Sequence, residues 1–405
     1  MTLPRDLRLS GFFAVAFVMV ALAGLPALTA STADQQSDPL SEPFKGVTTD
    51  GTVEPDLFSI RATGVSTAPV REAARRFLGG LTTAQRQATT FPADDLEWRR
   101  WNNVHRAARE GVSLREMTEA QRELAFGLMQ ASLSARGLEK SRNVMRLNGH
   151  LADLLDAWDE YGDDLYWFTV MGVPSATEPW GWQLDGHHLV INYFVLGDQV
   201  VMTPTFMGSE PVTATTGRYA GASVLQDEEA LGLAFMQRLD PEQQDRARGE
   251  EPKTRGNARA QAFRDNLVLD YQGLPGSELS AEQRAGLLRI ITEFVGNMDD
   301  GHARVRMDEV EQHLDRTFFY WLGEAGPEAV FYYRIHSPVI LIEFDHQGPV
   351  ALEGDRQVPT RAHVHTVVRT PNGNDYGKDL LRQHYEAHRD DEAHGHLHEG
   401  APGRR

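Results

Sequence analysis

The sequence predicts an α+β fold, in which helices flank a mostly antiparallel sheet built from hairpins, within a single large domain. Signals for helix starts are spread over residues 70–316, and β-rich runs joined by short turns lie at 166–206 and 330–369. Short turns join antiparallel partners, so most of the sheet should be antiparallel. No convincing domain boundary falls within 70–390, and 405 residues are ample to bury one core.

Four local patterns mark helix starts. In each, an apolar residue precedes Thr82, Thr118, Asp240 or Ser280, and a glutamine follows three residues later. This is the pattern of a capping box, in which two side chains satisfy free N–H groups at the helix start. The irregular spacings of 36, 122 and 40 residues indicate independent helix starts rather than a solenoid. Helices are expected at 70–79, 82–90, 118–136, 143–161, 226–238, 240–248, 280–296 and 307–316, and another should begin at Asp375 or Lys378.

Strand-forming runs are expected at 166–170, 188–196, 199–206, 330–336, 339–344 and 363–369. The short turn Leu196-Gly-Asp-Gln199 predicts that 188–206 forms a hairpin. Ser337-Pro338 interrupts a second pair of runs and predicts another hairpin.

The N-terminus predicts export. Residues 1–33 combine a basic start, an apolar run over 11–25 and small residues up to Ala33, as in a cleaved signal peptide. An uncleaved anchor is the alternative. The mature protein should be periplasmic or secreted, with no integral membrane association after cleavage. Residues 34–68 are predicted to be a linker or extended arm, and 69–388 the domain.

The amino-acid composition excludes several classes of function. The chain has 40 Lys and Arg against 58 Asp and Glu, a net charge of −18. This acid excess argues against nucleic acid as a partner. Cysteine is absent, which excludes disulfides, thiolate nucleophiles and cysteine-ligated metals. Any metal site must therefore use His, Asp, Glu or backbone oxygens.

The histidines are clustered, since nine of the fifteen lie within 336–398. Three of them belong to 389–405, predicted to be a disordered His-rich tail that either collects metal or has no role. His363 and His365 differ, because alternation along the predicted strand places both on one face. Two imidazoles on one strand face can begin a metal site or simply face solvent.

Other residues can complete such a site. Glu343 and Asp345 share a strand face and are candidates for a general base. Arg369 shares the face of His363 and His365 and is a candidate to bind a substrate carboxylate. The further candidate ligands are His187, His188, His346 and His384.

If His187 and His188 both lie on the strand, alternation allows at most one of them to join the site. The residue types suit one transition metal, with zinc favoured and copper or iron possible. We therefore expect a metal-dependent enzyme, most simply a hydrolase of a small-molecule or peptide substrate. The alternatives are a non-catalytic periplasmic protein that binds a metal or small ligand, and a structural or interaction protein.

Three segments resemble an uncharacterised family, catalogued as domain of unknown function 3500. They are Trp180-Gly-Trp182 with Gly186-His187-His188-Leu189, Pro204-Thr-Phe206-Met-Gly208-Ser-Glu-Pro211, and His363-Val-His365-Thr-Val-Val-Arg369 with Asn374-Asp375-Tyr376-Gly377. The resemblance covers roughly 70–388 and implies a common fold. It transfers no catalytic residue.

Overall fold

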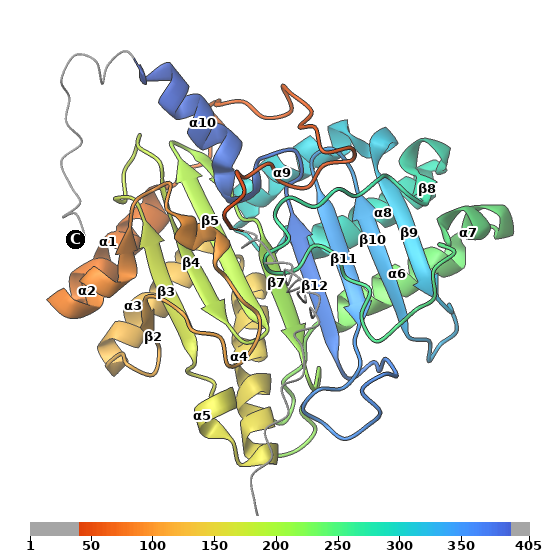
Figure 1. The fold of residues 1–405 in the computed structure, drawn as a ribbon, viewed down its shortest axis with the longest axis horizontal. Coiled ribbons are helices and arrows are strands. Elements are labelled where there is room, and N and C mark those ends of the chain that lie inside the picture. The colour runs from red at the N-terminus through yellow and green to blue at the C-terminus, as the bar shows by residue number, and fades with distance from the viewer. Residues whose placement is uncertain (1–39, 390–405) are drawn as a thin grey trace, which may run out of the picture. The chain divides into compact units, whose positions relative to one another are not determined.

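The computed structural model describes residues 40–389, which form one sheet with helices and irregular segments around it (Figure 1). The predicted signal peptide and His-rich tail lie outside this range. Within it, no helix is both long and apolar enough to cross a membrane. The order across the sheet is β1 (Thr90–Phe91), β3 (Tyr166–Met171), β4 (Trp180–Gly186), β5 (Leu189–Leu196), β7 (Thr205–Ser209), β12 (Val364–Arg369), β11 (Leu341–His346), β10 (Phe331–His336), β9 (Phe318–Gly323) and β8 (Leu274–Pro275).

Two further short strands, β2 (Val112–Ser113) and β6 (Gln199–Val201), pair with β3 and β5. Every pairing is antiparallel except that of β1 with β3. The α-helices are α1 (Ala68–Gly80), α2 (Thr83–Thr89), α3 (Glu119–Ser132), α4 (Ala135–Leu155), α5 (Trp158–Tyr161), α6 (Gln226–Arg238), α7 (Pro241–Ala247), α8 (Ala281–Val295), α9 (Asp300–Gln312) and α10 (Lys378–Ala387). The predicted α+β class is thus confirmed.

The chain consists of two halves with the same order of elements. Helices α1 to α4 and strands β3, β4, β5 and β7 form the first half. Helices α6 to α9 and strands β9 to β12 repeat this order in the second. The halves meet where β7 pairs with β12, and the strand order runs outward from this seam in mirror image. An approximate twofold axis therefore crosses the seam.

The capping boxes follow the same symmetry. All four predicted boxes form, and their glutamines contact each other in pairs. Gln121 Nε2 donates to Gln85 Oε1 over 2.8 Å, and Gln283 Nε2 donates to Gln243 Oε1 over 2.6 Å. The spacings of 36 and 40 residues are therefore one arrangement used twice. Each box forms from residues close in the chain, so each is an independent helix start. The second pair repeats the first because the second half of the chain repeats the order of elements of the first half.

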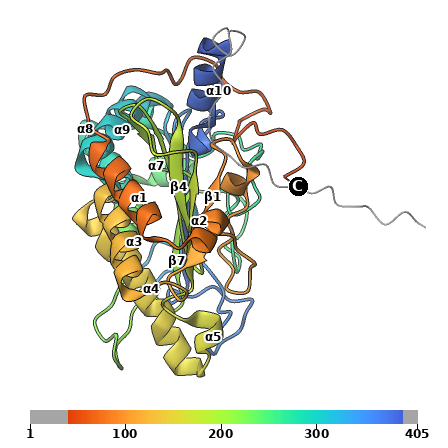
Figure 2. The ribbon, with the colours of Figure 1, turned by 90° about the vertical axis from the view of Figure 1, so that its left-hand side faces the viewer.

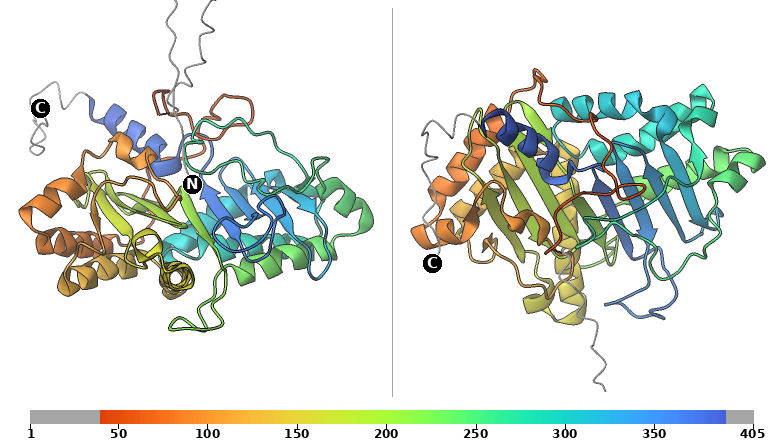
Figure 3. Two further views of the ribbon diagram at one scale, coloured as in Figure 1. Left: turned by 60° about the horizontal axis from the view of Figure 1, so that its bottom comes forward. Right: turned by 45° about the horizontal axis from the view of Figure 1, so that its top comes forward.

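The two faces of the sheet are covered differently. Helices α1, α3, α4, α8 and α9 lie on one side, whereas α2 and α10 lie on the other (Figure 2). On the second side, segments with little regular structure cross the strands (Figure 3). Val47, Trp98, Trp101 and Leu269 from these segments are buried against the sheet. The described part of the predicted arm, from residue 40 onward, is thus packed into the domain.

Several boundaries differ from those predicted. The helix expected at 143–161 begins earlier, at Ala135, because the Ser134 side chain caps its start. It ends at Leu155, because the next residue, Asp156, has a left-handed backbone. The run 199–206 divides into β6 and β7 around Thr203-Pro204. Strand β9 was not expected; it is buried on both faces and reads as a continuous apolar run without alternation.

Arg369 on β12 binds the irregular segment around residues 260–265 that covers this face of the sheet. Its guanidinium contacts Asp265 over 2.9 Å and Asp375 over 3.1 Å, and also donates to the carbonyls of Ala260 and Gln261. Arg99 holds the other oxygen of Asp265 over 2.7 Å. Although burial raises it, these two arginines hold the pKa of Asp265 below its usual range. The expected role of Arg369 in binding a substrate carboxylate therefore gives way to a structural one, because its donors are engaged within the protein.

Replacing Arg369 by methionine should lower the free energy of unfolding by about 3–5 kcal/mol, because buried Asp375 loses its arginine and buried Asp265 keeps only Arg99. Urea unfolding followed by circular dichroism measures this. Arg382→Met is the control, because Arg382 pairs with Asp379 and Glu386 on the exposed side of α10. It should cost under about 1 kcal/mol. Equal losses would contradict the role assigned to Arg369.

Candidate metal centre

Three histidines meet at one end of the seam. His188 lies in the two-residue turn between β4 and β5, with its backbone at φ 63°. His363 immediately precedes β12, and His365 is its second residue. Because β7 pairs with β12 and β5 pairs with β7, the turn carrying His188 is brought beside the start of β12. The two halves of the chain each contribute to the cluster.

The three side chains present their Nε2 atoms to one another. His363 Nε2 lies 3.1 Å from His365 Nε2, which lies 3.2 Å from His188 Nε2, and the whole group fits within 4.8 Å. A tetrahedral zinc ion, 2.0–2.1 Å from each nitrogen, separates neighbouring ligand nitrogens by about 3.3 Å. The two distances that involve His365 match this spacing, and the group of three can hold a metal ion.

Hydrogen bonds at the far side of two rings fix their tautomers. His363 Nδ1 lies 2.8 Å from the carbonyl oxygen of Gly348, and His365 Nδ1 lies 3.2 Å from Gln261 Oε1. Both partners are acceptors, so each Nδ1 carries the proton and each Nε2 has a bare lone pair. This is how metal-ligating histidines are usually oriented.

Burial keeps the rings neutral. Desolvation lowers the pKa of His188 and His365 well below the usual range, and the pKa of each is lowered further by neighbouring imidazoles, including that of His363. Burial also lowers the pKa of His363, although Glu210 opposes the shift. Two facing lone pairs that cannot readily be neutralised by protonation repel each other. A bound cation would remove that repulsion.

Gly208 and Glu210 were not among the predicted site residues, but both help to position the three histidines. An added Cβ at Gly208, the cross-strand partner of His365, would lie 3.0 Å from the His365 ring and 3.1 Å from the His188 ring. Gly208 therefore makes room for both ligands. Glu210 is buried, with Oε2 3.7 Å from His363 Nδ1, and accepts the N–H groups of residues 350–352. Gly208 and Glu210 both lie in the segment 204–211, which is one of the three that resemble the family. That resemblance was the sequence feature that could have pointed to them.

His187 lies beside the cluster but is not one of its three members. Its ring stacks on His188 with 3.9 Å between centroids, and its Nδ1 lies 2.6 Å from Asn148 Oδ1. The expectation that at most one of the two histidines joins the site agrees with this geometry, but its condition, that both lie on the strand, does not hold. Both residues lie in a turn, where strand alternation does not apply, and their rings point the same way.

Two other candidate ligands lie elsewhere. His346 faces the helix side of the sheet, where its Nδ1 accepts the Phe331 N–H over 2.9 Å and its Nε2 lies 3.5 Å from Glu229. The residue is one position out of phase with Asp345, so alternation turns it away from His365. His384 lies on α10 and pairs with Glu178 over 3.3 Å. Neither is brought to the three-histidine group.

The two candidate carboxylates anchor a covering loop. Glu343 accepts the N–H groups of Arg259 and Ala260 and the hydroxyl of Tyr332. Asp345, the cross-strand partner of His365, accepts the N–H groups of Asn257 and Ala258. Its other oxygen lies 3.0 Å from Lys253 Nζ. Their oxygens are thus occupied, which argues against the expected role as general base.

A family model described as Protein of unknown function (DUF3500) matches residues 63–378. The chain belongs to this family. The match spans both halves of the DUF3500 fold and includes His188, His363 and His365, whereas His384 lies beyond it. Comparison with curated proteins gave no match, and comparison with solved structures gave none either.

The buried histidines predict acid sensitivity of the metal-free protein. Histidines with a folded pKa below the unfolded value of about 6.5 bind protons on unfolding, so stability falls as pH drops below about 6.5. Each such group adds a slope of up to about 1.4 kcal/mol per pH unit. Urea unfolding of chelator-treated protein between pH 5 and 7 measures the slope. His365→Gln should reduce it by up to one proton, and an unchanged slope would contradict this.

Proposed function

We propose that the DUF3500 chain is an exported metal-dependent hydrolase, with one zinc ion held by His188, His363 and His365. The observation that carries the proposal is that His365 Nε2 lies 3.1 Å from His363 Nε2 and 3.2 Å from His188 Nε2, with all three ligand atoms within 4.8 Å of one another. In two of the rings the opposite nitrogen is already bonded to an acceptor. Three nitrogen ligands with no fourth protein ligand in the group match the pattern of catalytic rather than structural zinc sites.

The donor set supports hydrolysis. Three neutral imidazoles leave the full double charge on a divalent ion, which then acts as a Lewis acid and lowers the pKa of bound water to about 7. The protein residues contribute orientation. Gly348 and Gln261 fix two tautomers, Glu210 lies beside His363, and Gly208 leaves space for the rings. Export rests on the signal-like residues 1–33 and on an all-histidine donor set that needs no thiol.

A second candidate is a non-catalytic metal-binding protein. It is favoured by the burial of the ligands, since His188 and His363 are 5% and 3% exposed. A substrate must reach the fourth position past the partly buried His365, whereas a stored or structural ion needs no such access.

Metal content tests the site. The full chain, with tail residues His394, His396 and His398 changed to glutamine, should carry about one equivalent of zinc after metal-replete growth, measured by elemental mass spectrometry. His365→Ala should lose it, because two of the three ligands cannot hold the ion alone. His346→Gln is the matched control and should retain it. A folded protein without metal, or equal loss in both variants, would contradict the site.

Activity separates the two candidates. The zinc-loaded chain should hydrolyse a member of an ester, amide and phosphoester panel, with activity lost on chelation and restored by zinc. Cobalt substitution with azide titration reports whether the fourth position is open to exogenous ligands. An unchanged cobalt spectrum together with no turnover would favour non-catalytic metal binding and reject the hydrolase.

A further inference from the structure

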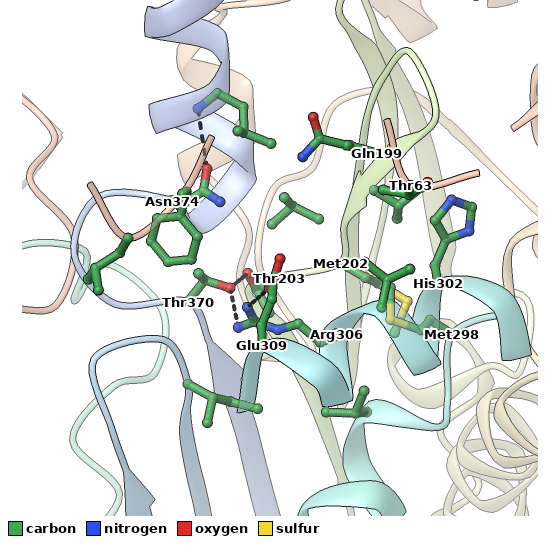
Figure 4. A pocket seen from close by; sticks show the side chains of 18 of the residues that line it. Thr63, Gln199, Met202, Thr203, Met298, His302, Arg306, Glu309, Thr370 and Asn374 are labelled. Atoms are coloured by element: carbon green, nitrogen blue, oxygen red, sulfur yellow. Dashed lines mark hydrogen bonds and ion pairs between the residues drawn. The ribbon is translucent and has the colours of Figure 1, made fainter. Parts of the chain in front are cut away.

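A second recessed site lies at the opposite end of the seam. It is a cavity of about 240 Å³ between the covering arm, strands β6, β7 and β12 and helix α9 (Figure 4). Its apolar lining includes Leu57, Phe58, Met202, Met298, Val305 and Leu380. The cavity lies at the end of the seam where Thr205 pairs with Val368, whereas His365 lies near the other end, where Ser209 pairs with Val364. The cavity is therefore separate from the three-histidine group.

The approximate twofold axis relates the two ends. Ile191 pairs with Thr205 in the first half, and Ile342 pairs with Val368 in the second, so Thr205 corresponds to Val368. These two equivalent residues also pair with each other across the seam. Three residues before Thr205, Met202 lies in the connection between β6 and β7, and three residues before Val368 is His365 on β12.

The charges at the cavity do not cancel. Among the described residues that line it, Glu309 is the one carboxylate, while Arg61 and Arg306 are two guanidinium groups. Glu309 Oε1 lies 3.0 Å from Arg61 Nη2, and Glu309 Oε2 lies 2.9 Å from Arg306 Nη1. One carboxylate shared by two arginines leaves one positive charge. His302, also in the lining, is paired with Asp299. The cavity therefore has an excess of positive charge, although the whole chain has a net charge of −18.

Arg306, Thr203 and Thr370 lie together at the floor of the cavity, where one threonine hydroxyl can donate a hydrogen bond to a ligand. Arg306 Nη2 is held by the carbonyl oxygen of Val339 and by Thr370 Oγ1, over 2.5 and 3.0 Å. Thr370 Oγ1 lies 2.7 Å from Thr203 Oγ1, so the two hydroxyls share one hydrogen bond. Each hydroxyl has one hydrogen, and the remaining one has no acceptor among the described contacts. A fixed guanidinium beside a free buried hydroxyl suits an oxyanion.

The walls are held in place. Gln199 binds both the N–H of Arg61 and the carbonyl of Ser59, over 2.7 and 3.0 Å. Gln383 on α10 binds the carbonyl of Phe58 over 3.0 Å. Figure 4 shows Gln199 and Asn374 on opposite sides of the space, with Arg306, Thr203 and Thr370 grouped beneath. Such a pre-formed site requires little ordering when a ligand binds.

We propose that this cavity binds a small organic carboxylate with a compact apolar body. The carboxylate faces Arg306 and the hydroxyl pair, and the apolar body contacts Phe58, Met202 and Leu380. The volume lies below the range of about 300–1,000 Å³ that is usual for drug-sized ligands, so the occupant is small. This inference does not depend on the metal centre or on hydrolysis.

Isothermal titration of the full chain with hexanoate tests the proposal, and hexanol and hexylamine are the neutral and cationic probes. Hexanoate should saturate one site, and the other two probes should bind at least roughly tenfold more weakly, as expected when a charged hydrogen bond is lost. The titration is run on zinc-loaded and on chelator-treated protein, because carboxylates also bind metal ions. Binding to this cavity should be equal in both.

Two variants should shift the affinity in opposite directions. Arg61→Met removes the uncompensated charge and should weaken hexanoate binding roughly fivefold, since the side chain is partly exposed. Glu309→Gln removes the competing carboxylate and should strengthen binding by a similar factor. Arg316→Met, which breaks an exposed pair with Glu54, is the matched control and should change nothing. Loss of fold cannot produce an increase in affinity, so the Glu309 variant keeps the test decisive.

Three results would overturn the proposal. Absence of saturable hexanoate binding below about 10 mM would show that the cavity takes no carboxylate. Equal affinity for hexanol would show that the site is merely apolar. Binding that disappears on chelation would place the carboxylate at the metal centre. Failure of the metal-content experiment would leave the hexanoate result unaffected, so the two proposals fail separately.

Discussion

The antiparallel pairing of β7 with β12 is the contact on which both sites depend. It joins two half-sheets into one, and it brings Gly208 opposite His365. Without it, His188 would remain on the first half and the other two ligands on the second. The opposite end of the same pairing carries the hydrogen-bonded Thr203 and Thr370 at the floor of the cavity. One backbone ladder thus positions two sites because an approximate twofold axis crosses it.

The sheet face that carries the histidines is covered mainly by irregular chain, which creates a hydrogen-bonding problem. Loop N–H groups removed from water need acceptors, and the loops supply few among themselves. Buried carboxylates provide them: Glu343 and Asp345 bind the loop near residues 257–260, and Glu210 binds residues 350–352. Part of the acid excess of the sequence is therefore structural. Acids predicted to act in chemistry near the histidines hold the covering loops instead.

Much of the fold was readable because it is local. Capping boxes act within four residues, and the hairpins depend on adjacent runs, so both were predicted correctly. The equivalence of the halves was not recognised, because the register of equivalent strands and glutamine pairs is a tertiary property. In the candidate site, period-two alternation correctly put His363 and His365 together. The same alternation turns His346 away, although His346 was a candidate ligand. Alternation does not apply at His187 and His188, whose positions in a turn place both rings on one side.

The sequence by itself determined the α+β class, the helix starts, the family and the shared strand face of His363 and His365. These follow from interactions between residues close in the chain, or from motifs that can be matched directly. Only the tertiary structure decided that His188 is the third member of the group, that Glu343, Asp345 and Arg369 are held by loop and ion-pair partners, and that a charged cavity closes the other end of the seam. Those outcomes depend largely on contacts between residues more than 80 positions apart, such as His188 with His365, Glu343 with Ala260 and Arg369 with Asp265. The register of such contacts is set by packing of the two halves and leaves no periodic trace in the sequence.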